Sequence, residues 1–186
     1  MPNVKDAIWE LTAADGSVIV HTGVTGRAAR TGHRLTIEMQ RWSASVTWRD
    51  GEPTGLKATI PVDSLQVRSG EGGLTPFTGV EKSVARANAL KTLRADRFSD
   101  ITFEASSIEK SVDGYHVDGT LTIHGQSRSH GLDLTVDDRG DRWAITTDTG
   151  ITQSDFGIKP YSQMMGALKV ADDVRVAVDV THTKSD

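Results

Sequence analysis

The side chains able to perform chemistry are few in this sequence and widely spaced. The 186 residues include six His and no Cys, which excludes thiol nucleophiles, disulfides, zinc ribbons and iron–sulfur clusters together. One S-x-x-K pair, Ser107 and Lys110, ends a predicted strand, where this spacing places the two side chains on opposite faces. The same pair serves penicillin-recognising enzymes at the start of a helix, so here it predicts no acyl transfer.

The His residues do not form a metal-ligand motif. His116 and His124 share strand parity but lie eight residues apart, about 26 Å along a strand, so they cannot hold one ion. His124 and His130 flank a turn, with Asp133 near, which leaves a surface metal site open beside the alternative of solvated polar residues. The sequence also lacks a nucleophile elbow, a phosphate-binding loop and a dinucleotide fingerprint. We therefore expect no metal, no cofactor and no enzymatic activity.

The elements that must position these side chains are mainly strands, because apolar and polar residues alternate along most of the chain. One wet and one dry face is typical of antiparallel strands, and turn dipeptides such as Asp50-Gly51 and Asp113-Gly114 separate them. The pattern predicts an all-β antiparallel barrel of about eight to ten strands. The predicted strands are 35–39, 42–48, 56–62, 101–105, 115–123, 132–136 and 174–181, with weaker ones at 7–13, 17–24 and 142–151.

One segment breaks this rhythm and predicts a helix within residues 78–96. Thr78 followed by Glu81 is a capping-box pattern. Val80, Val84, Ala87 and Leu90 then recur at helical spacing and predict an apolar helix face. The preceding Gly-rich stretch, 69–73, is expected to be a flexible loop. We find no internal repeat and no dividing linker, so we expect one domain over residues 1–186, with the helix packed beside the barrel.

Composition and charge limit the classes of partner and the cellular location that we expect. Lys and Arg number 21 against 25 Asp and Glu, a net charge of −4, so no basic field is available for nucleic acid. The first residues, Met1 to Asp6, lack the basic start and apolar stretch of a secretory signal. No run of more than three consecutive non-Gly apolar residues occurs, which predicts no membrane-spanning helix. We expect a cytoplasmic protein.

The dry parity of the strands gathers large apolar side chains that we expect to line the barrel interior. An eight-stranded barrel is either filled by its own side chains or holds one small ligand. Periodicity does not separate these cases, and composition alone favours a packed core. Two Met residues in a late loop suit an adaptable apolar lid. The candidate ligand-binding residues are Leu35, Ile37, Trp42, Trp48, Phe103, Leu121, Ile123, Leu134, Trp143, Phe156, Met164 and Met165.

Four segments, in order along residues 90–180, resemble motifs of the YceI-like family. Residues 93–103, LRADRFSDITF, are similar to its L-x-x-x-x-F-P-x-I-x-F stretch, and residues 119–127, GTLTIHGQS, resemble G-x-L-T-I-x-G-x-[ST]. Residues 154–158, SDFGI, resemble R-x-D-F-G-I, and residues 165–174, MGALKVADDV, resemble G-x-[IL]-x-V-x-D-x-V. Ser154 stands where the family often has Arg, and the first strands also differ. The chain thus resembles a divergent branch without a signal peptide.

The resemblance implies a lipocalin-like antiparallel barrel whose apolar tunnel holds a polyisoprenoid chain, such as an isoprenoid quinone or a polyprenyl lipid. It favours a hollow interior over a packed one, and it brings no catalytic residue. We therefore expect binding, carriage or sequestration of such a lipid without covalent chemistry. Two alternatives stay open, a packed barrel acting as an interaction or stress-response module and an enzyme acting on a lipidic substrate. The oligomeric state, a homodimer included, also stays open.

Overall fold

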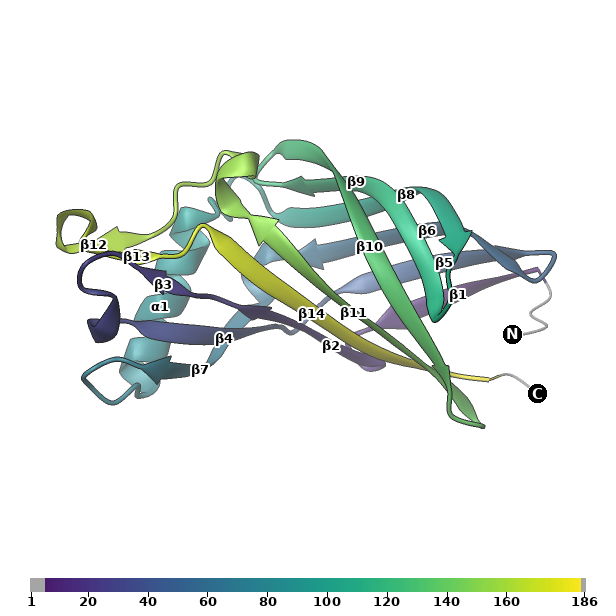
Figure 1. The fold of residues 1–186 in the computed structure, drawn as a ribbon, viewed down its shortest axis with the longest axis horizontal. Coiled ribbons are helices and arrows are strands. Elements are labelled where there is room, and N and C mark those ends of the chain that lie inside the picture. Colours follow the sequence, from purple (N-terminus) through teal and green to yellow (C-terminus); the bar gives the residue numbers. More distant parts are fainter. Residues whose placement is uncertain (1–5, 185–186) are drawn as a thin grey trace.

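Antiparallel strands form most of the computed structural model, which describes residues 6–184 (Figure 1). The main sheet has eleven strands in the order β1-β5-β6-β8-β9-β10-β11-β14-β2-β4-β7. Their bounds are Ala7–Thr12 (β1), Gly16–His21 (β2), His33–Met39 (β4), Ser43–Arg49 (β5), Glu52–Pro61 (β6), Leu65–Gly72 (β7), Asp100–Lys110 (β8), Gly114–Ile123 (β9), Gln126–Asp138 (β10), Arg142–Thr152 (β11) and Asp173–Thr183 (β14). Residues 1–5, which carry most of the segment on which the signal-peptide expectation rests, lie outside the described part.

The expected all-β antiparallel architecture with one helix is confirmed, as a strongly curled half-barrel. All ten predicted strands are present, and the main sheet has one more, β7. The expectation of a flexible loop over 69–73 is wrong for most of its length, because β7 continues to Gly72. A side chain at Gly70 would lie 2.8 Å from the Phe77 ring. This Gly therefore marks the close approach of an aromatic ring to a strand, which a loop reading misses.

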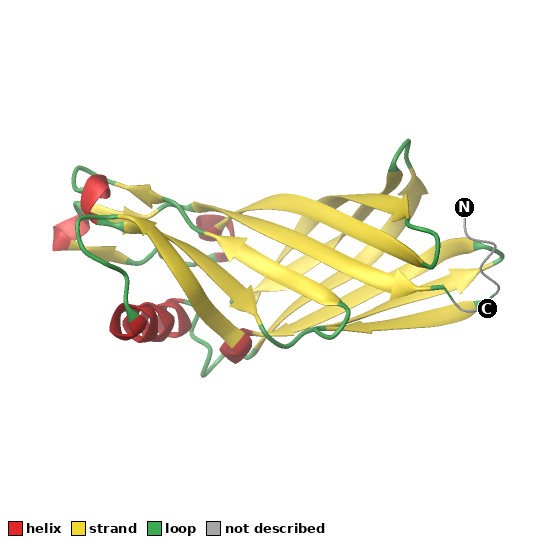
Figure 2. Cartoon of the chain, turned by 90° about the horizontal axis from the view of Figure 1, so that it is seen from below, coloured by secondary structure: helices red, strands yellow, loops and turns green. Residues whose placement is uncertain are grey.

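A second, smaller sheet lies at one end of the molecule, beside the helix (Figures 1 and 2). Its order is β12-β13-β3, with bounds Ser162–Gln163 (β12), Leu168–Val170 (β13) and Val24–Thr25 (β3). We call this the helix end. The opposite end, where β1 begins and β14 finishes, is the terminal end. Within residues 6–184, no helix is long and apolar enough to cross a membrane.

The two edges of the main sheet are joined by chain connections. Strands β1, β5 and β6 lie at one edge and β2, β4 and β7 at the other. Each strand of the first group connects directly to one of the second, through corners at 13–15, 40–42 and 62–64. No ladder between β1 and β7 closes the ring within the described residues. The expected continuous barrel is thus replaced by a curled sheet with a seam that the chain crosses three times.

The seam is held by apolar packing and by a small polar network. Ser64, a buried polar residue, donates its hydroxyl to the carbonyls of Pro61 and Arg41, at 2.7 and 3.1 Å. The Gln40 amide donates to the Ser64 carbonyl at 3.1 Å, so the second and third corners are tied together. The buried residues around them, named here the corner cluster, are Leu11, Val18, Ile37, Met39, Trp42, Val62, Leu65, Val67 and Val180.

Helix α1 (Gly79–Thr92) packs against β7 and the corner cluster. It begins where predicted, because the Thr78 amide donates to the Glu81 carboxylate at 2.9 Å in a capping box. Its packed face carries Ala85, Ala89 and Leu90, whose small Ala side chains let the helix approach the strand. The predicted face is therefore wrong at Val80 and Val84, which are 73% and 53% exposed.

Candidate functional site

The inner face of the half-barrel is fixed by the strand register. Val178 of β14 lies opposite Thr147 of β11 and Val18 of β2, and Val18 is buried in the corner cluster. Because strand side chains alternate between faces, every second residue from Val178 along β14 points inward. The same alternation, carried through the ladders, identifies the inner residues of each neighbouring strand.

At the terminal end the inner face is closed by an aromatic cluster of Trp9, Trp48 and Trp143, all at most 9% exposed. The Trp9 and Trp48 rings lie 4.7 Å apart, and the His182 ring stacks on Trp9 at 4.1 Å. The Lys184 ammonium lies 4.0 Å from the centroid of Trp143, in a cation–π contact. This end is therefore filled by large rings in direct contact.

A third buried group, named here the β9 cluster, fills the side of the half-barrel formed by β8 and β9. At its centre Val117 is fully buried. Burial also raises the pKa of the Tyr115 hydroxyl above its ordinary value. The members of the β9 cluster are Phe103, Tyr115, Val117, Leu121, Ile123, Phe156 and Ile158.

Between these packed regions, a stretch of the inner face stays partly open. Along β14 the inner residues change from buried Val180, near the terminal end, to partly exposed Val178 and Val176 toward the helix end. On β4 the same change runs from buried Ile37 to partly exposed Leu35. Most of these side chains also pack against the corner cluster or the β9 cluster, so each is covered on one side and partly exposed on the other. We call the partly exposed apolar residues of this stretch the open inner face: Val20, Leu35, Leu132, Leu134, Ile151, Val174, Val176 and Val178.

Strands β10 and β11 separate alongside the open inner face. They pair only from Thr135 to Asp138 on β10, although β10 begins at Gln126, and Figure 1 shows the two strands diverging beyond this pairing. Where they diverge, His130 and Thr149 share inner parity and hydrogen-bond at 2.8 Å between Nε2 and Oγ1. Burial lowers the pKa of His130, which favours the neutral imidazole. Where the backbone ladder between β10 and β11 is missing, this side-chain hydrogen bond connects the two strands.

Three buried polar atoms of the described residues have no hydrogen-bond partner: the indole nitrogens of Trp42 and Trp48, and the hydroxyl of Thr147. Thr147 lies on the inner face opposite Val178. Buried polar groups are nearly always paired. These three atoms therefore supply unused hydrogen-bonding capacity within or beside an otherwise apolar interior.

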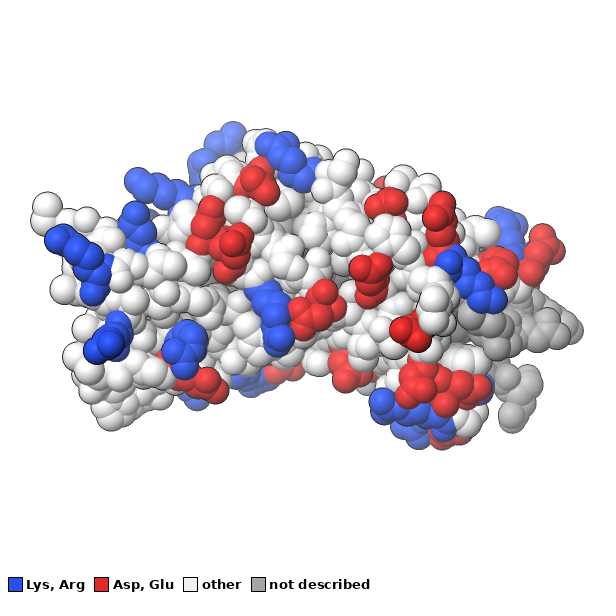
Figure 3. Space-filling view, viewed as in Figure 1, with Lys and Arg blue, Asp and Glu red and all other residues white. Residues whose placement is uncertain are grey.

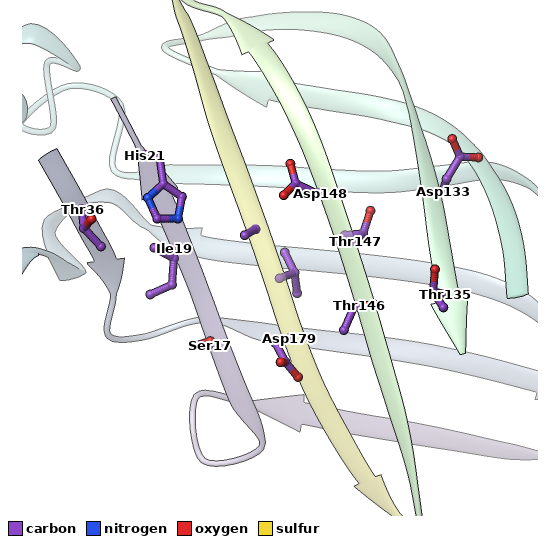
Figure 4. A pocket seen from close by; sticks show the side chains of 12 residues that line it. Ser17, Ile19, His21, Thr36, Asp133, Thr135, Thr146, Thr147, Asp148 and Asp179 are labelled. Carbon is purple, nitrogen blue, oxygen red and sulfur yellow. The ribbon is translucent and has the colours of Figure 1, made fainter. Parts of the chain in front are cut away.

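A hollow of about 790 Å³ lies along β10, β11, β14, β2 and β4 (Figure 4). Most of its lining residues have the outer parity: Thr146 of β11 lies opposite Asp179 of β14, which lies opposite Ser17 of β2. Thr147 and Val178, which have the inner parity, line it too. Asp133 and Asp148 also border it. Its hydroxyls and carboxylates do not suit an apolar chain, but Val178 belongs to both the hollow and the open inner face, so the hollow borders that face on its polar side.

The His residues are dispersed, and no group of three potential ligands that could hold a metal is found among residues 6–184. The strand register places His130 opposite Gly119, away from the turn that holds His124. His116 instead bonds Asp133 at 2.6 Å. That bond, with Asp118 nearby, raises the pKa of His116.

The candidate ligand-binding residues fall into four environments. Ile37 and Trp42 belong to the corner cluster, Trp48 and Trp143 to the aromatic cluster, and Phe103, Leu121, Ile123 and Phe156 to the β9 cluster. Leu35 and Leu134 lie on the open inner face. Met164 and Met165 lie outside, 63% and 107% exposed. Both take positive φ in a turn beside β12, and their role as an apolar lid over a ligand stays a prediction.

Sequence reasoning missed several residues of the open inner face, chiefly Val20, Val176 and Val178. The signal was present, because β14 was predicted with this apolar parity. Ranking residues by size drew attention to the large rings instead. In this fold the large rings fill the terminal end and the packed clusters, whereas smaller aliphatic side chains line the part that stays partly open.

Comparisons with known proteins agree with this fold. The chain is similar to the crystal structure of BcnA from Burkholderia cenocepacia, with a TM-score of 0.66 and 19% identity, over 89% of this chain and 96% of that one. It is also similar to the YceI protein of Campylobacter jejuni, with a TM-score of 0.61 and 19% identity, over 81% of this chain and 85% of that one. Among proteins with curated descriptions, none matches this sequence.

A family model decides the classification. The model of the YceI-like domain matches residues 9–182, from Trp9 of the aromatic cluster to His182 stacked upon it. The match therefore includes every strand of the inner face as well as the four segments whose motifs suggested the family. The chain belongs to the YceI-like family, a family associated with polyisoprenoid binding.

Proposed function

We propose that this protein binds and carries, or sequesters, a polyisoprenoid-type lipid along the open inner face. The observation that carries the proposal is the contrast on β14, where inner Val180 is buried while Val178 and Val176 stay partly exposed. Apolar side chains that stay only partly covered in a curled sheet offer a surface that an apolar chain can cover further. Family membership supports the same class of ligand.

The physical driving force is burial of hydrocarbon. Each methylene that leaves water contributes about 0.8 kcal/mol, so a long isoprenoid chain gains enough from an apolar groove without specific contacts. The branched aliphatic side chains of Val176, Val178 and Leu134 offer such a surface. Binding of this kind selects for apolar length and cross-section more than for one chemical structure.

The unpaired polar atom on the inner face favours an isoprenoid that carries an oxygen acceptor. The Thr147 hydroxyl lies opposite Val178, can donate a hydrogen bond, and has no partner among the described residues. A quinone carbonyl would accept such a hydrogen bond, and a pure hydrocarbon would not. Within the proposed class, an isoprenoid quinone therefore ranks above a polyprenyl hydrocarbon.

The proposal assigns no covalent step to the protein, in keeping with a family that is generally non-enzymatic. The alternative of a filled barrel acting as an interaction module does not account for the exposure of Val176 and Val178. A lipid-modifying enzyme would need reactive groups along the inner face. There, the described polar side chains include His130 and Thr149, which bond to each other.

Organic extraction of the purified protein, followed by mass spectrometry, tests the proposal directly. We expect recovery of an isoprenoid lipid near one molecule per chain, and native mass spectrometry should show the same added mass. Delipidated protein should rebind an isoprenoid quinone added in detergent and rise in melting temperature. Absence of both a co-purified lipid and a shift with added quinone would refute the proposal.

Two Leu→Trp variants separate a binding surface from a packed core. Leu134 lies on the open inner face, whereas Leu121 is buried in the β9 cluster. Leu134→Trp should occupy space for the ligand, lowering lipid recovery severalfold while leaving the melting temperature of delipidated protein near that of the wild type. Leu121→Trp should overpack the β9 cluster and destabilise by about 1–3 kcal/mol. Equal destabilisation by both variants, without a change in bound lipid, would favour a filled interior.

A further inference from the structure

The small sheet at the helix end and the segments beside it carry a concentration of positive charge, bordered by Asp155, Asp172, Glu71 and Glu81. Residues 22–34 and 156–171 together contain five Lys or Arg residues and neither Asp nor Glu. That leaves 16 Lys or Arg against 25 Asp or Glu elsewhere in a protein whose net charge is −4. Figure 3 shows the extreme of this end with blue side chains and no red ones. The five basic residues, all exposed, are Arg27, Arg30, Arg34, Lys159 and Lys169.

The two segments are held together by the small sheet, so their charges form one patch. Lys169 of β13 lies opposite Thr25 of β3, and the Ala28 amide donates to the Ala167 carbonyl at 2.8 Å. The chain at Ala28 therefore lies beside Ala167, which places Arg27 near the turn that holds Met165. A side chain at Gly166 would meet the Lys169 side chain at 3.2 Å, which places that Lys beside the same turn.

These charges are free for an external partner. Arg34 makes one distant contact with Glu71, at 3.9 Å between exposed groups, which contributes little. Arg27, Arg30, Lys159 and Lys169 form no ion pair with another described residue. At the terminal end, by contrast, Lys184 pairs with Asp138 and Arg139 with Asp137.

Exposed apolar side chains lie within and beside the basic patch. Met164 and Met165 are 63% and 107% exposed at the tip of the small sheet. Leu74, Val80 and Val84, also exposed, lie on the β7–α1 connection and on α1. Of the seven exposed large apolar residues within the described part of the chain, five are thus at the helix end. The turn that carries the Met pair is fixed by positive φ at Met164, Met165 and Gly166, which presents both side chains outward.

We propose that the helix end is a docking surface for an anionic lipid bilayer. Lys and Arg side chains attract anionic headgroups, and the flexible apolar Met side chains enter the interface between headgroups and acyl chains. We commit to a bilayer over an acidic protein, and the vesicles used below contain no protein, so binding to them requires no protein partner. Docking needs no lipid inside the half-barrel, so it stands or falls independently of the proposed function.

Vesicle cosedimentation of the full chain tests the docking surface. We expect binding to phosphatidylcholine vesicles that contain phosphatidylglycerol, weaker binding to pure phosphatidylcholine, and loss as salt is raised. Arg27→Gln with Lys169→Gln should weaken binding to the anionic vesicles by about tenfold or more. Met164→Asn with Met165→Asn should also weaken it, and Asn tolerates the positive φ of this turn.

The matched control changes the same kinds of residue at the terminal end. Val112 is 100% exposed in the turn before β9. This turn lies near the end of β10, because the Val136 amide donates to the Asp113 carbonyl. Arg49 is exposed at the end of β5. Val112→Asn with Arg49→Gln should leave vesicle binding unchanged. Melting temperatures of all variants should equal that of the wild type, because every altered side chain is exposed.

The absence of Cys allows a direct measurement of insertion. An environment-sensitive dye attached to Met165→Cys should shift to the blue with phosphatidylglycerol vesicles, and a dye on Val112→Cys should not. The proposal is overturned if neither vesicle type binds the protein, if the terminal-end control lowers binding as much as the helix-end variants, or if the dye at residue 165 stays in water while the protein binds. None of these outcomes depends on whether isoprenoid is recovered from the interior.

Discussion

The two ends of the half-barrel differ in whether their apolar side chains are buried or exposed. At the terminal end, Trp9, Trp48 and Trp143 are buried against one another. At the helix end, Met164, Met165 and Val80 face solvent, and the inner Val side chains nearby are only partly covered. The difference shows that apolar character alone does not mark the core: one end uses it for closure and the other leaves it available.

The contrast extends to charge. Lys184 and Arg139 at the terminal end are paired with Asp138 and Asp137, while Arg27 and Lys169 at the helix end have no acidic partner in the described chain. The three predictions below test whether stability and availability are divided in this way.

The largest expected effect is loss of the aromatic closure. Trp48→Ala should lower the free energy of unfolding by about 3–5 kcal/mol, because it empties a ring-sized space in the aromatic cluster and removes the Trp9 contact. Chemical denaturation measures the change. The helix-end control, Val84→Ala, alters a side chain that is 53% exposed and should stay within about 0.5 kcal/mol of wild type. A Trp48→Ala protein as stable as that control would break the comparison.

A smaller effect is expected where the helix begins. Thr78→Ala should cost about 1 kcal/mol, because it removes the side chain of the capping box at the start of α1. Ser83→Ala, at an exposed position of the same helix, is the matched control. It removes only a hydroxyl bonded back to the Gly79 carbonyl and should be neutral or slightly stabilising. If both variants lose equal stability, the cap is not what fixes this end of the helix.

The smallest effect concerns pH at the terminal end. Burial lowers the pKa of His182 below its ordinary value, with Asp15 opposing, so the unfolded chain takes up this proton at higher pH than the folded one. Stability should therefore fall as pH drops below about 6.5, until the folded His182 is itself protonated. His182→Gln should make the free energy of unfolding less sensitive to pH there. An NMR titration that gives His182 a pKa above the ordinary value would reverse the sign.

Local patterns predicted most elements of this fold. Alternation located strands such as β9 and β14, and the Thr78–Glu81 pair located the start of α1. These features depend on residues close in sequence, which is why they can be read from a single chain. The apolar side chains expected to be buried were mostly buried, although in three clusters.

The missing information was tertiary. Nothing in the sequence shows that β1, β5 and β6 continue across a seam into β2, β4 and β7, because that depends on how far the sheet curls. The prediction of which side of α1 faces β7 was also wrong, because Ala85 and Ala89 permit a close approach that larger Val side chains would prevent. Whether an inner Val is covered depends on neighbours remote in sequence, so Val178 and Val180 could not be distinguished.

The seam gives this half-barrel a mechanical property that a continuous barrel lacks. In a ring closed by ladders, strand spacing of about 4.7–4.9 Å fixes the circumference, and widening it breaks backbone hydrogen bonds. Here the corners at 13–15, 40–42 and 62–64 cross the join, where side-chain packing around Trp42 and Val62 sets the separation of the two edges. Widening the molecule at the seam would disturb this packing, the short corners and the Ser64 hydrogen bonds, but it would break no ladder between β1 and β7. The seam is thus the line along which the girth is set by side chains and corners and not by a ladder.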